Sequence, residues 1–251
     1  MLSAVIITRD EERNIARCLR SLAWVDEVVV VDSASTDRTR EIAASHGARL
    51  VDIPWQGFGP TKQAGVDAAS FDWVLSIDAD EEVTPELRAA IERALAEPAH
   101  HGWRIGRRSF YLGRAIRHSG WRDDAPVRLF HRAHGRFDDE QIHEAVHVDG
   151  PVGHLDGLLL HHTYPDLATH LAKIETYSAM AARQLHDRGR RASILSAALR
   201  GNWKFWSMYV LRLGVLDGRE GLVLAFMSAY AITLKYLRLW ELGAREGAHD
   251  A

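Results

Sequence analysis

The chain has 251 residues, of which 47% are hydrophobic and 26% are charged, and its formal net charge is −3 at pH 7. This length and composition predict one large domain, or one domain with an appendage, with room for a sizeable hydrophobic core. Such a charge excludes a strongly basic chain, so we expect no nucleic acid among its partners. The single cysteine, Cys18, excludes an intrachain disulfide and fits a reducing compartment. A strand follows Met1 without an apolar leader, so we expect a cytoplasmic protein.

Short apolar strands alternate with helices over roughly the first 80 residues. The predicted strands are residues 4–8, 28–32, 50–53 and 73–77, and the predicted helices run to about Leu22, from Asp37 to about His46 with Ser35 or Thr36 as the cap, and onward from the glycine-rich residues 55–60. Strands this uniformly apolar are typical of parallel strands covered on both faces. The alternation predicts an α/β fold with a mainly parallel, doubly wound sheet.

Acidic side chains follow three of these strands. They are Asp10 and Glu11, Asp32, and Asp78 and Asp80. Asp78 and Asp80 point to the same side of an extended backbone, where they can bind one hard cation, Mg²⁺ or Mn²⁺, that also holds a diphosphate. The alternative is that the acids of this segment serve the N-terminus of the next helix, which Thr84 and Pro85 begin; we expect this of Glu81 and Glu82. Neither a Gly-x-Gly-x-x-Gly fingerprint nor a P-loop is present.

The middle of the chain is basic and aromatic. Residues 104–117 predict a strand with loops, and residues 127–132 alternate apolar and basic side chains as a half-buried strand does. An acidic cluster follows at residues 137–144, which alternatively forms a helix rich in solvated acids. Residues 158–164 predict a strand that carries two adjacent histidines, His161 and His162, and neutral imidazole is a ligand for divalent metals.

From about Asp166 the pattern is wholly helical. Residues 183–240 contain ten Lys or Arg against three Asp or Glu, interleaved with Trp, Phe and Tyr. This composition predicts helices that lie on a membrane surface, with a helical layer that covers the sheet as the alternative. The uncharged run from Leu222 to Leu234 has thirteen residues, fewer than the roughly 20 that span a bilayer.

Three ordered segments resemble the nucleotide-sugar-binding segments of family 2 glycosyltransferases, which have the GT-A fold. They are residues 5–11, 30–37 and 75–81. The resemblance implies that Asp32 binds the nucleobase, that Glu11 lies near the ribose with Thr8 and Arg9 in the same segment, and that Asp78-Ala79-Asp80 is an Asp-x-Asp motif for metal and diphosphate. Lys62 and Arg128 are candidates for further contacts with the diphosphate.

The resemblance also suggests the catalytic base and a further metal ligand. Inverting sugar transfer needs one carboxylate to take the proton from the acceptor hydroxyl. Glu144 is the candidate, because it is the acid of an Ile-His-Glu segment found in some of these enzymes; Asp139 and Glu140 are its rivals. A histidine three residues before a tyrosine completes the metal site in related enzymes, which points to His161, with His162 second.

Within the family, the chain is most similar to bacterial lipopolysaccharide core glucosyltransferases. The resemblance rests on residues 55–59, 73–81, 142–144 and 160–164, with Lys204-Phe205 and residues 216–218 near the end. It implies a UDP-linked glucose donor and a heptose acceptor at the inner face of the cytoplasmic membrane. His162 departs from the pattern, since an aromatic residue is usual there. The predicted division is a catalytic domain, 1–165, with a nucleotide-sugar-binding half (1–100) and an acceptor half (101–165), then a membrane-associating helical region, 166–251.

Three other functions share parts of this pattern. A transferase that acts on a polyprenyl phosphate would use the same donor site but would need no base. A sugar nucleotidyltransferase would share the sheet, but its glycine-rich start is absent. A non-catalytic nucleotide-binding membrane adaptor would bind UDP without turnover.

Overall fold

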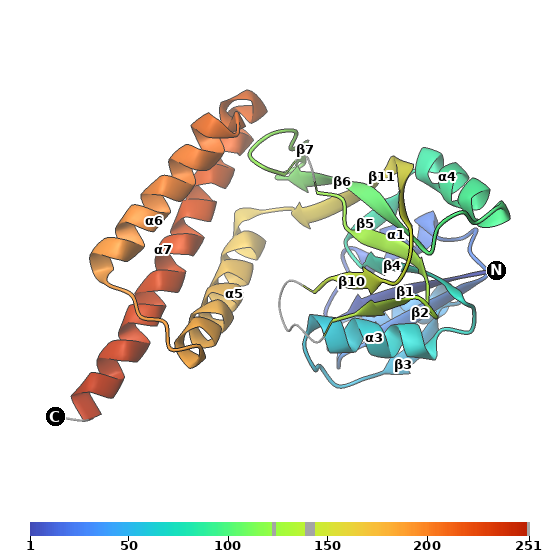
Figure 1. Cartoon of the computed structure of the whole chain (residues 1–251), viewed down its shortest axis with the longest axis horizontal. Coiled ribbons are helices and arrows are strands. Elements are labelled where there is room, and N and C mark those ends of the chain that lie inside the picture. The colour runs from blue at the N-terminus through green and yellow to red at the C-terminus, as the bar shows by residue number, and fades with distance from the viewer. Residues whose placement is uncertain (122–123, 139–143, 250–251) are drawn as a thin grey trace. The chain divides into compact units, whose positions relative to one another are not determined.

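The computed structural model describes residues 1–121, 124–138 and 144–249, with side chains up to residue 245. The chain divides into two compact units, of which the first is Met1–Arg108 with Asp123–His162 and the second is Ser109–Arg122 with Thr163–Ala251. Figure 1 labels the elements of both units.

The first unit is built on a mixed sheet. Its elements are β1 (Leu2–Thr8), α1 (Ile15–Ser21), β2 (Glu27–Asp32), α2 (Thr39–Ser45), β3 (Arg49–Asp52), α3 (Phe58–Ala68), β4 (Trp73–Asp78), β5 (Glu81–Val83), α4 (Pro85–Ala96), β6 (Gly102–Tyr111), β8 (Val127–His131), β9 (Gly135–Phe137), β10 (Val146–Val148) and β11 (Val152–Tyr164). Within the described chain the strand order is β3-β2-β1-β4-β8-β6-β11-β5, while β9 and β10 form a separate antiparallel pair. β6 and β11 continue into the second unit.

The predicted α/β fold is confirmed, with two corrections. β3, β2, β1 and β4 pair in parallel, whereas β8 pairs antiparallel with both β4 and β6, and β11 with β5, so the sheet is mixed. The cap predicted for α2 is also wrong, because Thr36 donates to Asp10 and Ser35 Oγ accepts from the Asp10 N–H. Asp37 instead accepts from the backbone N–H of Thr39 at 2.9 Å.

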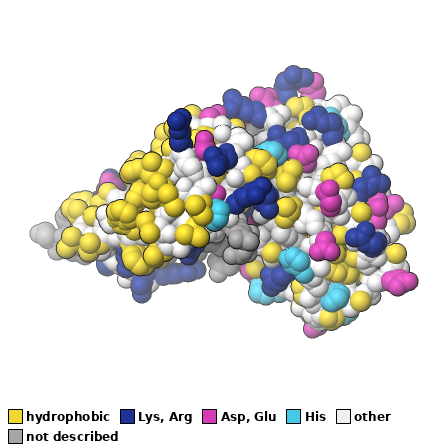
Figure 2. Space-filling view, turned by 90° about the horizontal axis from the view of Figure 1, so that it is seen from above, with side chains coloured by type: hydrophobic (Ala, Val, Ile, Leu, Met, Phe, Trp, Pro, Cys, Tyr) yellow, Lys and Arg dark blue, Asp and Glu magenta, His cyan; other side chains and the backbone are white. Residues whose placement is uncertain are grey.

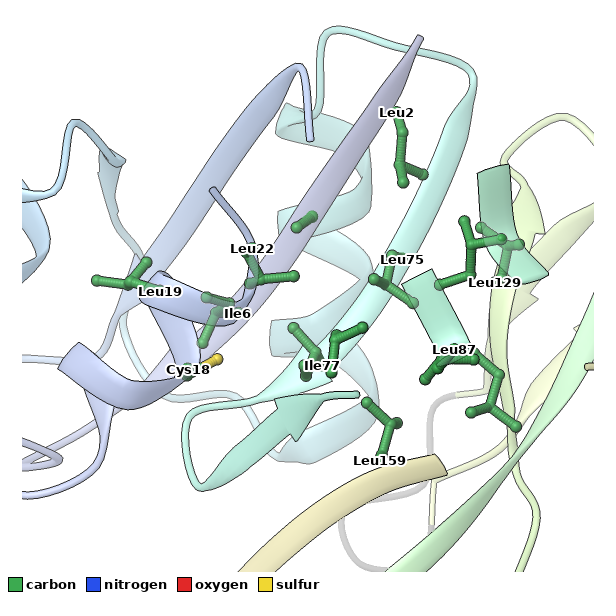
Figure 3. Packing of buried hydrophobic residues seen from close by; sticks show 14 of the residues in the cluster. Leu2, Ile6, Cys18, Leu19, Leu22, Leu75, Ile77, Leu87, Leu129 and Leu159 are labelled. Atoms are coloured by element: carbon green, nitrogen blue, oxygen red, sulfur yellow. The ribbon is translucent and has the colours of Figure 1, made fainter. Parts of the chain in front are cut away.

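A cluster of aliphatic side chains holds α1 and α4 against the sheet. Ile6, Leu75 and Ile77 project from β1 and β4 into this cluster, where Leu19 and Leu87 meet them from the helices (Figure 3). Cys18 lies in the same cluster with no exposed surface, which confirms the predicted core position. Burial raises the pKa of its thiol well above the ordinary value, and the nearby Glu81 carboxylate adds to the shift. The thiol is therefore not poised as a nucleophile.

The second unit is mainly helical, as predicted. Its elements are β7 (Arg114–Ala115), α5 (Leu167–Asp187), α6 (Ile194–Trp206), the π-helical turn η1 (Ser207–Leu211), the 3₁₀ turn η2 (Gly214–Asp217) and α7 (Gly218–His249). Both α5 and α6 pack along α7 (Figure 1). The α6–α7 approach is close, because a Cβ at Gly201 would clash with Thr233 Oγ1.

Asp217 ties the helices of this unit to the loop that follows β7. Its carboxylate is 2% exposed and accepts the backbone N–H groups of Arg117 at 2.9 Å and His118 at 3.0 Å, and Ser119 Oγ at 3.0 Å. Three donors to one buried carboxylate satisfy its charge and fix the loop.

One helical segment is long and apolar. Among the described residues, Gly214–Arg245 alone has the length and composition to cross a membrane, and 17% of its most apolar window is buried. The uncharged run of this region alone is too short to span a bilayer. The helix α7 that contains it has 32 residues and is long enough. Length and apolar composition alone do not show that it crosses a membrane, because core helices of soluble proteins share both properties.

Candidate active site

The candidate site lies at the carboxyl ends of three neighbouring parallel strands. β1 lies between β2 and β4, with Thr8 opposite Asp32 and Ile7 opposite Asp78. The register therefore brings the acids that end β2 and β4 to one edge of the sheet, on either side of β1. Ligands of open α/β sheets bind at this edge.

The loops after β1 and β2 are bonded to each other. The Asp10 N–H donates to Ser35 Oγ at 2.9 Å, and the Thr36 N–H donates to Asp10 Oδ1 at 2.7 Å. Asp10 and Ala34 have φ angles of 55° and 62°, which are unusual for residues with a Cβ and are held by these contacts. Arg9 is exposed beside this pair of loops.

Asp32 is buried and hydrogen-bonded. It is 1% exposed and accepts from the Ser35 N–H at 3.0 Å, Arg40 Nη1 at 2.9 Å and Thr8 Oγ1 at 3.3 Å. Burial raises the pKa of Asp32, but the bonds from Ser35 and Arg40 outweigh burial and hold the pKa below its ordinary value. An ionised carboxylate at this edge can accept an N–H from a ligand ring.

Lys62 is buried at 3% exposure and joins two acids. Its Nζ lies 2.8 Å from Asp78 Oδ1 and 2.6 Å from Glu144 Oε1. One turn later in α3, a Cβ at Gly65 would lie 2.6 Å from Val5 Cγ1, so the glycine lets the helix approach the sheet closely. This approach brings the ammonium to the end of β4, and the alternative of a solvated surface lysine is excluded.

Asp78 lies between two cations. Besides Lys62, Arg128 Nη2 contacts Asp78 Oδ2 at 2.6 Å, and the arginine is 5% exposed. Burial raises the pKa of Asp78, but the charges of Arg128 and Lys62 prevail and hold it well below its ordinary value. Asp78 is therefore ionised, with both oxygens engaged by the protein.

Glu81 belongs to the same network, and the expectation that it serves the next helix is wrong. It has no exposed surface; Oε1 accepts from Arg128 Nη2 at 2.9 Å and Arg107 Nη1 at 3.1 Å, while Oε2 accepts the Asp78 N–H at 2.9 Å. Thr84 caps α4 instead. The physical reason is the pairing of β5 with β11, which makes Glu81 part of the sheet.

Asp80 lies beside one of the two predicted histidines. His161 Nε2 is 3.4 Å from Asp80 Oδ2, whereas His162 Nε2 is 3.4 Å from Glu82 Oε2. Burial lowers the pKa of His161, but its hydrogen bond to Asp80 and the charge of Asp80 prevail and raise it. Of the two histidines, His161 is therefore the one that contacts the second acid of the Asp-x-Asp motif.

A comparison with models of protein families matches residues 3–147 to the one described as "Glycosyl transferase family 2", which covers more than half of the chain. The chain belongs to the family 2 glycosyltransferases. The predicted family, its GT-A fold and an enzymatic activity are confirmed together.

Relatives match this transferase along its whole length. The lipopolysaccharide core biosynthesis glycosyltransferase LpsC of Rhizobium meliloti is 30% identical over 100% of this chain and 97% of its own. An uncharacterized glycosyltransferase of Rickettsia typhi is 29% identical over 97% of this chain and 88% of its own.

Solved structures are similar at lower levels. Glucosyl-3-phosphoglycerate synthase of Mycobacterium tuberculosis, in complex with Mn²⁺, UDP and glucosyl-3-phosphoglycerate, is 28% identical over 44% of each chain, with a TM-score of 0.37. TarS of S. aureus, in complex with UDP, covers 98% of this chain and 91% of its own at 14% identity, with a TM-score of 0.48.

Two side chains of the transferase fit a divalent cation. Asp80 supplies a carboxylate and His161 an imidazole, at 10% and 17% side-chain exposure. The described residues contain no group of three or more His, Cys, Asp or Glu arranged to hold a metal, and Asp78 is turned to Lys62 and Arg128. Mg²⁺ is commonly held by one or two protein ligands with substrate phosphates and water, so the pair suffices when a diphosphate completes the shell.

Paired histidine variants test this assignment. We expect His161→Ala to raise the Mn²⁺ concentration for half-maximal turnover at least about tenfold, because His161 is one of the two side chains that fit the cation. His162→Ala is the matched control and should leave that concentration within about twofold. Equal shifts in the two variants, measured by UDP release against Mn²⁺, would contradict the assignment.

Sequence reasoning found most of the polar residues at this edge, but it missed Arg40 and Arg107 and gave Glu81 a different role. β6 carries three arginines, Arg104, Arg107 and Arg108, so no local feature of the sequence distinguishes Arg107 from its neighbours. The rival bases Asp139 and Glu140 lie outside the described residues.

Proposed function

We propose that this transferase moves a sugar, with glucose as the first candidate, from a UDP-sugar to the heptose of a lipopolysaccharide inner core, with inversion and with Mg²⁺ or Mn²⁺. The observation that carries the proposal is the chain of contacts from Asp78 through Lys62 to Glu144. It joins a candidate base to the motif for the leaving diphosphate. The acceptor class is supported by the full-length similarity to LpsC.

The donor would lie along the edge formed by β1, β2 and β4. The nucleobase would bind Asp32, and the ribose would lie near Glu11, with Thr8 and Arg9 in the same segment. Ala79, between the two aspartates, is buried at 4% exposure.

Glu144 would act as the base. Its Oε1 accepts from Lys62, and Oε2 has no hydrogen-bond partner among the described residues. In the proposed step Oε2 takes the proton of the acceptor hydroxyl, and the hydroxyl oxygen attacks the anomeric carbon of the donor sugar. The bond from this carbon to the diphosphate oxygen breaks on the opposite face. Lys62 fixes the position of the carboxylate throughout.

Positive charge would stabilise the departing diphosphate. A divalent cation held by Asp80 and His161 would offset the charge that develops on the leaving group. Lys62 and Arg128 hold Asp78 in place and carry further positive charge at the same strand end.

We further propose that the protein is peripheral on the inner face of the cytoplasmic membrane, attached through its helical unit. The exposed large hydrophobic residues of α6 support this assignment, because they would otherwise face water. They are Ile194, Leu195, Leu199, Trp203 and Trp206.

A donor screen tests the function. UDP-glucose, other UDP-sugars and GDP-sugars are incubated with the protein, Mn²⁺ and deacylated inner-core acceptor, and release of UDP or GDP is measured. Acceptor-dependent UDP release with formation of a β-linked product, which inversion of the α-linked donor gives, supports the proposal. Binding of UDP without turnover would favour a non-catalytic adaptor. In a parallel reaction with UTP and glucose 1-phosphate, release of pyrophosphate would favour a nucleotidyltransferase.

Glu144→Gln tests the base. We expect transfer to fall by a factor on the order of 10²–10⁴, because the amide cannot take the proton. Asp149→Asn, which alters an exposed carboxylate just beyond β10, should leave the rate unchanged. Full turnover by Glu144→Gln would favour an acceptor that is already a phosphate, such as a polyprenyl phosphate.

A further inference from the structure

A cavity in the helical unit is lined by four basic side chains. It has a volume of about 430 Å³ and is formed between α6 and its continuation on one side and α7 on the other. The bases are Arg200, Lys204, Arg212 and Lys235, and Trp203, Leu199 and Tyr236 complete most of the wall. The cavity belongs entirely to the second unit and contains no residue of the candidate active site.

These four positive charges have no acidic counterpart in the part of the chain that the structure describes. No carboxylate there lies within ion-pair distance of any of them. Both Arg200 Cζ and Lys235 Nζ instead contact the Tyr236 ring, at 4.6 and 4.8 Å from its centroid. Burial lowers the pKa of Lys204, and the charges of Arg212 and Lys235 lower it further. Like charges gathered this closely are costly, and a bound anion would relieve the repulsion.

An apolar stripe borders the cavity. Leu195, Leu199, Trp203, Trp206 and Val210 recur three or four residues apart, and their exposed fractions are 69%, 62%, 65%, 51% and 47%. Figure 2 shows a broad hydrophobic area on the helical part, at the left of the view, with basic side chains along its lower edge. Leu199 and Trp203 belong to both the stripe and the cavity wall. An anion in the cavity would therefore lie at the boundary between an apolar and a polar layer, as a lipid phosphate does.

We propose that the cavity formed by Arg200, Lys204, Arg212 and Lys235 binds the phosphate headgroup of an anionic membrane phospholipid, while the Leu195–Val210 stripe enters the acyl boundary. The inference rests on the proposed attachment to a membrane and specifies the lipid class and the site. A second copy of the chain is a poorer occupant, because a two-fold interface through this stripe would bring basic cavities toward each other.

Vesicle binding by the full chain tests the proposal. We expect vesicles of phosphatidylcholine with about 30 mol% phosphatidylglycerol to bind the wild type at least about tenfold more tightly than phosphatidylcholine alone, and added NaCl to weaken this binding. Lys204→Gln with Lys235→Gln should weaken it about 30-fold, since each base near an anionic surface contributes roughly fivefold. Inorganic phosphate at millimolar concentration should compete poorly, because it lacks the acyl chain.

The matched control removes the same charge elsewhere. Arg20→Gln with Arg93→Gln alters two exposed bases of the first unit and should bind these vesicles as the wild type does. Leu199→Ala with Trp203→Ala should weaken binding to both kinds of vesicle. UDP release with deacylated acceptor should be unchanged in all of these variants, which separates loss of attachment from loss of the proposed activity.

Three results would overturn the proposal. The first is equal binding of the wild type to both kinds of vesicle, and the second is wild-type binding by the Lys204→Gln, Lys235→Gln variant. The third is a dimer in light scattering that Leu199→Ala with Trp203→Ala converts to a monomer, which would assign the stripe to a second copy.

Discussion

Replacing Lys62 with methionine should both destabilise the protein and abolish most of its transferase activity. The ammonium is buried and lies within 2.8 Å of Asp78 and 2.6 Å of Glu144, so its removal leaves two carboxylates without this shared cation. Breaking a buried pair by removing one partner typically costs about 3–5 kcal/mol. Loss of one preorganised positive group in a site of this kind lowers kcat on the order of 10²–10³-fold. Urea unfolding and UDP release with deacylated acceptor measure the two effects.

A double variant separates the structural effect of Lys62 from its effect on turnover. Lys62→Met with Glu144→Gln removes the carboxylate that the single change leaves unpaired, so part of the lost free energy of unfolding should return. Turnover should stay low, because both the base and its partner are absent. If Lys62→Met alone unfolds at the wild-type urea concentration and keeps full turnover, the contacts to Asp78 and Glu144 do not organise the site.

The parallel half of the sheet could be predicted because its signals are local. Each of β1, β2 and β4 is a short apolar run that ends near an acid, and parallel strands bring their carboxyl ends to one edge. Thr8, Asp32 and Asp78 therefore lie together as expected. The antiparallel half depends on pairings between distant segments, such as Glu81 with His161, for which the sequence has no local signal.

Charge compensation was the harder part of the site to predict. The sequence predicted Asp78 and Arg128 as site residues but contained no signal that they contact each other at 2.6 Å. It also left open which histidine lies beside the Asp-x-Asp motif, a choice that depends on which face of β11 each ring occupies. The same is true of the helical unit. The sequence shows its excess of basic residues, but it does not show that Lys204 of α6 and Lys235 of α7 line one cavity.

Glu81 and Glu82 show most directly where sequence reasoning fails, and they form a matched pair for experiment. Both were expected to serve the N-terminus of α4, which predicts similar and small effects for their replacement by glutamine. In the structure Glu81 has no exposed surface and contacts Arg107 and Arg128, whereas the Glu82 side chain is 34% exposed, 3.9 Å from Arg17.

Glu81→Gln should therefore lower the free energy of unfolding by about 3–5 kcal/mol, because Arg107 and Arg128 lose a buried negative charge that they share. Glu82→Gln should lower it by less than about 1 kcal/mol, as is usual for partly exposed ion pairs. Because Glu81 also accepts the Asp78 N–H, its replacement should disturb the Asp-x-Asp backbone and raise the Mn²⁺ requirement for UDP release. Urea unfolding and Mn²⁺ titration of both variants test this. Equal, small effects would mean that the two acids act only on α4, and that Arg107 and Arg128 are held by Asp124 and Asp78 alone.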